Sequence, residues 1–159
     1  MEERKPDFVE RESERGAVLV VTAMLDDVVK GILETFFIEG STADSLLSEK
    51  GGAIGDYFTR SNVAYVLGLI SKTELQRLQI IGELRNQLAH VWHVEQLAQV
   101  PTAKTKLDEL ARLRSEPAPD SKRDDTISPE RALFQHEAIK LFAALMSRLE
   151  NTERRERYP

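Results

Sequence analysis

The sequence predicts an all-α protein, a single-domain helical bundle with a long buried central helix. Apolar residues recur at spacings of three and four from Glu14 to Ile38, which is the periodicity of a helix that buries one face. Two further helix starts are indicated by the capping box Ser71-Lys72-Thr73-Glu74 and by Ser128 followed by Pro129. With 159 residues, 41% of them hydrophobic, the chain has enough apolar surface for one core.

The expected organisation places a helical core between polar segments. Residues 1–12 form a charged N-terminal arm, residues 13–114 form the helical core, and residues 115–127 form a polar, Pro-bearing, flexible linker loop. Residues 128–153 form a C-terminal helix that packs on the core. Residues 154–159 form a basic tail, which we interpret as a solvated helix end whose arginines complement the helix macrodipole, in preference to a nucleic-acid contact.

The central helix is expected from Glu14 to Ile38. Its apolar stripe comprises Val18, Val21, Leu25, Val28, Ile32 and Phe36, widened by Leu19, Met24, Val29, Leu33 and Phe37. Two adjacent acids, Asp26 and Asp27, interrupt the apolar pattern. Because neighbouring residues on a helix point about 100° apart, their carboxylates cannot face one ligand. We therefore interpret them as a solvated face, with Asp26 four residues before Lys30, and not as a metal or acid–base site.

Shorter elements are expected between the central helix and the capping box. Ser41 to Leu47 has the pattern of a short helical turn, and Asp56 to Ile70 that of a longer helix. Lys50 to Gly55 is rich in glycine, but it lacks the Gly-Lys-Ser/Thr ending and the preceding strand of a phosphate loop, so a flexible bend is favoured. The longer helix is expected to have one face formed by Phe58, Asn62, Tyr65 and Leu69, with Val63, Val66, Leu67 and Ile70 beside it.

The second half of the chain is expected to contain three helices. The helix that the capping box opens has the buried side Leu75, Leu78, Ile81, Leu84, Leu88 and Val91. A modest amphipathic helix follows Pro101, from about Ala103 to Arg114. The last helix begins after Ser128, with the core side Leu133, Ile139, Phe142, Leu145, Met146 and Leu149.

The amino-acid composition excludes several classes of protein. The chain has no Cys, so a disulfide framework and a thiolate metal site are excluded, and no metal or organic cofactor is implied. The longest apolar run, Ala17 to Leu25, is far shorter than the ~20 residues of a membrane span. Since the N-terminus also lacks the apolar region of a secretory signal, we expect a cytoplasmic protein without membrane contact.

The charge and helix pattern argue against direct reading of DNA. The 22 Lys and Arg residues against 27 Asp and Glu residues give a net charge of −5, which has the wrong sign for a surface that binds phosphate backbones. The joint Leu67 to Ser71 is the nearest approach to a helix-turn-helix, yet Lys72 and Arg77 are the only strong cations that follow it closely. We expect DNA to be bound only weakly or indirectly.

The octapeptide from Glu83 to His90 brings together several side chains that could take part in catalysis. Asn86 and His90 share a helix face, whereas Arg85 and His90 point roughly 140° apart. A joint site therefore needs a loosened helix end or two copies of the motif that meet in a dimer. Such a site would cleave RNA without a metal, with His90 as acid or base and with Arg85 and Asn86 holding the phosphate.

The alternative for the octapeptide is structural, and we favour it. In this interpretation Arg85 pairs with an acidic side chain such as Asp26, Asp27 or Asp56, and His90 closes the helix by bonding its last carbonyl groups.

Three segments carry a resemblance to a known family. They are Ser13-Glu14-Arg15-Gly16 before the long helix, Gly55 to Ser71, and Ile81 to His90, and together they resemble the mannitol operon repressor (MltR) family over roughly residues 13 to 95. The resemblance implies an all-helical bacterial protein assigned to repression of a sugar-alcohol operon, without a winged or helix-turn-helix reader.

A shorter resemblance is limited to the octapeptide. Arg85-Asn86 with His90 resembles the signature of HEPN domains, which are helical bundles, many of them ribonucleases that act as dimers. This resemblance implies that Arg85 and His90 are catalytic and that Asn86 is the polar residue after the arginine.

Together these features predict a bacterial transcriptional regulator that is not an enzyme. It is expected to act mainly through contacts with a protein partner in a regulatory complex, and a homodimer is left open. The alternative is a HEPN-like, metal-independent ribonuclease that uses Arg85, Asn86 and His90.

Overall fold

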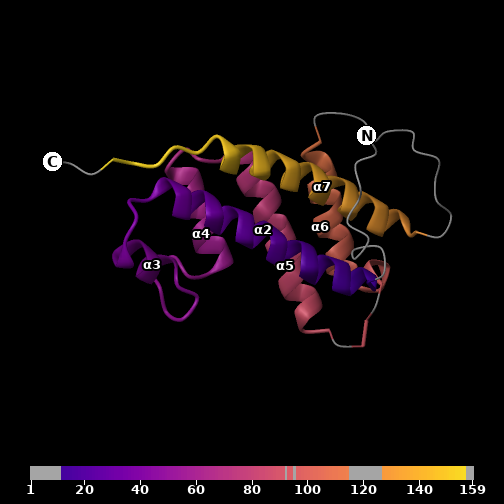
Figure 1. The fold of residues 1–159 in the computed structure, drawn as a ribbon. Helices are drawn as coiled ribbons and strands as arrows, with labels where there is room; N and C mark the ends of the chain where they lie inside the picture. The colour runs from indigo at the N-terminus through magenta and orange to yellow at the C-terminus, as the bar shows by residue number, and fades with distance from the viewer. Residues whose placement is uncertain (1–11, 92, 95, 115–126, 157–159) are drawn as a thin grey trace.

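The computed structural model describes residues 12–91, 93–94, 96–114 and 127–156, and all regular structure in these ranges is helical (Figure 1). This confirms the all-α, single-domain prediction. The elements are α2 (Glu14–Phe36), α3 (Ser41–Leu47), α4 (Tyr57–Val66), α5 (Lys72–Ala89), the 3-10 turn η1 (Leu97–Gln99), α6 (Pro101–Arg112) and α7 (Pro129–Glu150). The predicted arm 1–12 and linker 115–127 lie outside the described residues, apart from Glu12 and Ile127.

Helix α2 is the central helix of the bundle. It packs against α4, α5 and α7, and α7 runs beside it in Figure 1. Its fully buried side chains include Val18, Leu25, Val29, Ile32 and Leu33. The helix starts at the Ser13 cap, whose hydroxyl accepts a hydrogen bond from Gly16 N at 3.1 Å. It ends two residues before the predicted Ile38, because Phe37 adopts an extended conformation with ψ 154°.

Helix α4 is shorter than the predicted helix over Asp56 to Ile70. Asp56 is its cap, and the helix stops at Val66 because Gly68 takes a positive φ of 75°. The amide of Leu69 then donates to the carbonyl of Ala64 at 2.9 Å, and that of Gly68 donates to Tyr65, which is the Schellman pattern. This early end leaves Val66 81% exposed instead of placing it beside a buried face.

The capping box of α5 is confirmed. The Ser71 hydroxyl accepts from Glu74 N at 3.2 Å, and the Glu74 carboxylate accepts from Ser71 N at 2.5 Å. The predicted buried side is confirmed by Leu75, Leu78, Ile81, Leu84 and Leu88, while Val91, beyond the helix end, is partly buried.

Helix α7 begins where predicted, because Ser128 caps it by accepting from Arg131 N at 3.1 Å. The prediction of its core side is partly wrong, since Ile139 is 52% exposed. The stripe of the helix that is buried consists instead of Phe134, Glu137, Ala138, Leu141 and Leu145. Leu133, Phe142, Met146 and Leu149 are partly buried at the edges of this stripe.

The described part of the C-terminal segment, residues 151–156, is not the solvated helix end that was predicted. The helix stops at Glu150 rather than 153, and the chain continues without regular structure to the end of α2. There Arg155 N donates to the carbonyl of Phe36 at 2.9 Å, and Arg154 Nη1 lies 3.0 Å from Glu39 Oε2. Since α2 has no basic residue in its last turn, Arg155 N supplies a donor for one carbonyl at the end of the helix.

Candidate functional site

The octapeptide lies at the exposed end of α5. Arg85 and His90 are exposed and Asn86 is partly exposed, while Leu84 and Leu88 of the same segment are buried in the core. Arg85 Nη1 donates a hydrogen bond to Asn86 Oδ1 at 2.9 Å. The three polar side chains are therefore accessible to a ligand or to a second molecule.

The expected pairing of Arg85 with an acid on another helix is wrong. Asp26 pairs instead with Arg60, whose Nη1 lies 2.7 Å from Asp26 Oδ2. Asp27 is exposed on α2, and the Asp56 carboxylate caps α4 by accepting from Thr59 N at 3.0 Å. Hydrogen bonds from Thr59 lower the pKa of the Asp56 carboxyl group.

The interpretation of Asp26 as a solvated acid one turn before Lys30 is also corrected. Lys30 Nζ lies 3.8 Å from Glu34, while Asp26 is directed to Arg60 of α4. Arg60 is 1% exposed and also donates from Nη2 to the carbonyl of Leu47 at 3.0 Å, so it ties α2, α3 and α4 together.

The end of α5 is capped by an arginine from α2. Arg15 Nε donates to the carbonyl of Leu88 at 2.9 Å, which is a bond that His90 was expected to make. His90 is the C-cap residue, and the bond it forms to Leu88 comes from its backbone N–H. Arg15 belongs to the first of the three segments that resemble the mannitol operon repressor family. It therefore contacts the octapeptide of the third segment, and this contact is structural.

Within one chain, Arg85 and His90 are not brought onto one face. Helix α5 remains regular through Ala89, and His90 keeps helical dihedrals with φ −88° and ψ −7°. The loosened helix end that a joint site in one chain needs is therefore not found. Two copies of the motif would be needed to bring Arg85 of one chain next to His90 of another.

A buried ionic cluster joins α5, α6 and α7, and the sequence interpretation missed it. Glu137 is fully buried, with Oε1 2.6 Å from Arg114 Nε and Oε2 3.5 Å from Arg77 Nη2. Arg77 also donates to the carbonyl of Leu113 at 3.0 Å. One signal was present in the sequence: Glu137 lies three residues after Phe134, in phase with the buried stripe of α7.

Two titratable groups are shifted by burial. The pKa of Tyr57 is raised by burial and then by the nearby Asp26 charge, and its hydroxyl donates to the carbonyl of Leu78 at 2.9 Å. Burial lowers the pKa of His136, whose Nε2 has no hydrogen-bond partner within the described residues. Tyr57 thus connects α4 to α5, and His136 is partly buried on α7, so we assign both groups structural roles.

A cluster of metal-ligating side chains or a membrane-spanning helix would indicate a further kind of site in the described ranges. No group of three His, Asp or Glu side chains is placed to hold a metal ion there. In the same part of the chain, no helix is long and apolar enough to cross a membrane.

The α4–α5 pair contains the joint that comes nearest to a helix-turn-helix in the sequence. Helix α5, which would be the recognition helix, packs against α2, α4, α6 and α7. Arg77, one of the two cations that follow the joint Leu67 to Ser71, is directed to Glu137 and to the carbonyl of Leu113. A recognition helix must instead present its side chains to the major groove.

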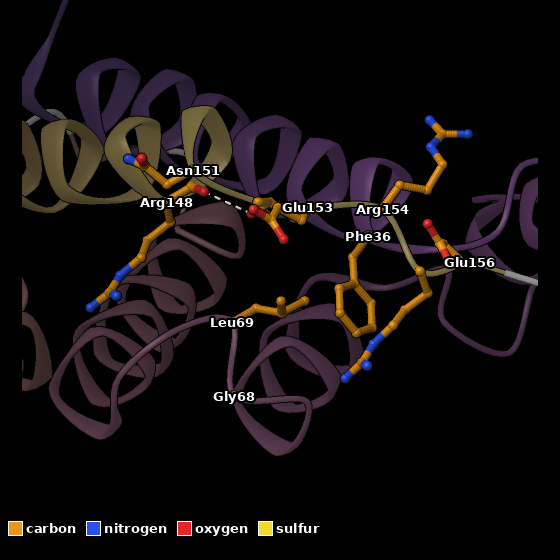
Figure 2. A pocket seen from close by; sticks show the side chains of 10 residues that line it. Phe36, Gly68, Leu69, Arg148, Asn151, Glu153, Arg154 and Glu156 are labelled. Carbon is orange, nitrogen blue, oxygen red and sulfur yellow. Dashed lines mark hydrogen bonds between the residues drawn. The ribbon is translucent and has the colours of Figure 1, made fainter.

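A groove lies where the end of α2, the α4–α5 turn and the C-terminal segment meet (Figure 2). This C-terminal groove has a volume of about 930 Å³ and is lined by Phe36, Gly68, Leu69, Arg148 and residues 151–156. In Figure 2, Arg148 and Arg154 lie at opposite ends, with Leu69 and Phe36 between them. The Thr152 hydroxyl donates to the carbonyl of Arg148 at 2.7 Å and fixes the turn that follows α7.

One solved structure is similar to this chain, whereas no protein-family model and no curated protein matches it. The similar chain belongs to the X-ray structure of the MtlR-HPr complex from Escherichia coli. The two chains are 20% identical, with a TM-score of 0.55 over 91% of this chain and 93% of that one. They share a fold.

Proposed function

We propose that this protein is a bacterial transcription-regulatory module of the mannitol operon repressor kind, which acts by binding another protein. The observation that supports this most is the fold, shared over 91% of the chain with a chain of the MtlR-HPr complex. The resemblance in residues 13 to 95 points to the same kind of protein. The proposed place of action is the cytoplasm.

The charge of the chain and the direction of Arg77 favour protein contacts over direct reading of an operator. Specific DNA binding depends on cations that neutralise phosphates and on side chains that reach base edges. Here Arg77 is directed inward, and the net charge of the chain is −5. Regulation is therefore proposed to pass through a partner protein, and HPr is the partner to test first, since the similar structure is a complex with HPr.

The test is a titration of the purified full chain with HPr from the same organism by isothermal calorimetry. A parallel band-shift experiment should use the mannitol operator DNA with and without HPr. We expect saturable binding of HPr and, for DNA alone, nothing tighter than the micromolar range of about 10⁻⁶ M that is typical of non-specific binding. A nanomolar, salt-resistant complex with operator DNA alone would overturn the proposal.

A metal-independent ribonuclease is the second candidate, because Arg85, Asn86 and His90 are all accessible at the end of α5. It requires a homodimer, since one chain does not bring Arg85 and His90 together. An RNA cleavage assay, described in the Discussion, separates the two candidates.

A further inference from the structure

We propose that the C-terminal groove, together with the exposed ridge Tyr65, Val66 and Leu67, binds an acidic segment of a partner protein that also carries apolar side chains. This inference rests on the proposed function, because it names the surface and the chemistry of the protein contact. It does not depend on which protein supplies the segment.

The apolar part of the surface is continuous along the chain. Val66 is 81% exposed, and Tyr65 and Leu67 are each 39% exposed. Gly68 and Leu69, which follow this ridge directly, line the groove. The Schellman bonds of Gly68 and Leu69 hold the ridge in position, so its side chains are exposed by a defined turn. Val66 and Leu67 directly precede Gly68, which lines the groove, so they offer apolar side chains to a segment bound at this end of α4.

The positive charge comes from three arginines around the groove. Arg148 Nε lies 3.3 Å from Glu74 and Arg154 Nη1 lies 3.0 Å from Glu39, so each is already neutralised in part. Arg155 differs, because its guanidinium group lies over the Phe36 ring, 5.1 Å from the ring centre. Its side chain forms no hydrogen bond or ion pair with any residue that the structure describes.

Arg155 is therefore a prepared anchor for a carboxylate. Its backbone is fixed by the 2.9 Å bond to the Phe36 carbonyl, and its planar side chain is held against the ring. A guanidinium group held in this way loses little rotational freedom when it binds, and its parallel N–H groups fit a carboxylate. Because Arg155 lines the groove together with Phe36, Gly68 and Leu69, it selects a segment in which a carboxylate is close to apolar side chains.

The lining of the groove favours a protein over a nucleic acid. Glu153 and Glu156 line the same groove, so its charges suit a single carboxylate placed at Arg155, whereas they would repel the successive charges of a phosphate backbone. Apolar side chains of the ridge would contribute little binding free energy against a duplex backbone. They would contribute more when they are buried against leucine or phenylalanine of a partner protein.

The test is a selection of short random peptides, displayed on phage, on the immobilised full chain. We expect enrichment of peptides with Asp or Glu close to Leu, Ile or Phe. In fluorescence anisotropy, the enriched peptides should bind about tenfold more weakly to Arg155→Glu and to Val66→Asp, which is the loss expected for one charge-assisted contact or one buried side chain. Arg112→Glu is the matched control, since it makes the same charge change on exposed α6, away from the groove.

The outcomes are distinct from those of the HPr titration. Failure to enrich any sequence overturns the groove proposal, and so does an enriched peptide that binds Arg155→Glu and Val66→Asp as tightly as wild type. A single-stranded or duplex oligonucleotide that binds wild type but not Arg155→Glu also overturns it, because the occupant would then be a nucleic acid. If HPr binds while the peptides fail, the proposed function stands and only the surface is wrong. Circular dichroism melting of each variant checks that it is folded.

Discussion

Arg15 of α2 closes the end of α5 by donating from Nε to the carbonyl of Leu88 at 2.9 Å. This contact links residues 73 positions apart and supports the octapeptide on the central helix. Replacing Arg15 by Ala should lower the free energy of unfolding by about 1 kcal/mol, the usual net value of one hydrogen bond. Urea denaturation followed by circular dichroism measures it. Arg112→Ala, at an exposed position of α6, should change stability by less than about 0.5 kcal/mol.

Gly82 and Gly31 should respond in opposite ways to substitution by Ala. A Cβ at Gly82 would lie 2.6 Å from Tyr57 Cε1, and that ring cannot turn away without losing its bond to Leu78. We expect Gly82→Ala to destabilise the protein by about 1–3 kcal/mol. At Gly31 the nearest atom is Leu149 Cδ1 at 3.5 Å, an ordinary contact, so Ala should stabilise α2 by about 0.5–1 kcal/mol. Thermal melts of both variants test this. If the α4–α5 contact were loose, the melting temperature would change in the same direction in both variants, which would contradict the prediction.

Arg60 should be among the most sensitive charged residues. Its removal leaves the Asp26 carboxylate, 25% exposed, and the Leu47 carbonyl without their donor. Arg60→Ala should cost about 3 kcal/mol in chemical denaturation, whereas Lys30→Ala, which removes a 3.8 Å surface pair, should cost less than about 0.5 kcal/mol. In a double-mutant cycle, adding Asp26→Ala should cost less in the Arg60→Ala background than in wild type. Strict additivity would mean that the pair is not coupled.

His136 should make the protein less stable in mild acid. Burial is the main cause that lowers its pKa, against an opposing effect of Glu137 and with the support of Lys140, Arg114 and Arg77. Because the unfolded chain binds the proton more readily, this contribution is fully present above the ordinary value of 6.5 and is lost as pH falls through it toward the folded pKa. His136→Gln should flatten the rise of unfolding free energy between about pH 5.5 and 7.5. His90→Gln, at an exposed position, is the control, and an equal change there would contradict the assignment.

Removal of Arg85 or His90 should change stability little, because both side chains are exposed and neither is bound to an acid within the described residues. We expect Arg85→Ala and His90→Ala to stay within about 0.5 kcal/mol of wild type. We also expect no cleavage of single-stranded RNA above background with EDTA present. Cleavage by wild type that His90→Ala abolishes at unchanged melting temperature would instead establish the ribonuclease.

The local signals in the sequence were sufficient for most helix starts and for the central helix. The Ser71 capping box, the Ser128 cap and the stripe from Val18 to Leu33 depend on residues within a few positions of each other, so they are readable from the chain itself. The end of α4 was predicted too late, although Gly68 was visible. A glycine can also continue a helix, so only the structure shows that Gly68 has a positive φ and that Leu69 N donates to the carbonyl of Ala64.

The pairing of charged groups was decided by the tertiary structure. Asp26 and Arg60 are 34 residues apart, and Arg15 reaches Leu88 across 73 residues, so no local spacing could show which partners would meet. For the same reason the sequence allowed several acidic partners for Arg85, whereas in the structure it pairs with none of them. The C-terminal groove likewise exists only because the segment after α7 returns to Phe36 at the end of α2. Helical periodicity is a property of neighbours along the chain, whereas ion pairs and grooves depend on how whole helices pack.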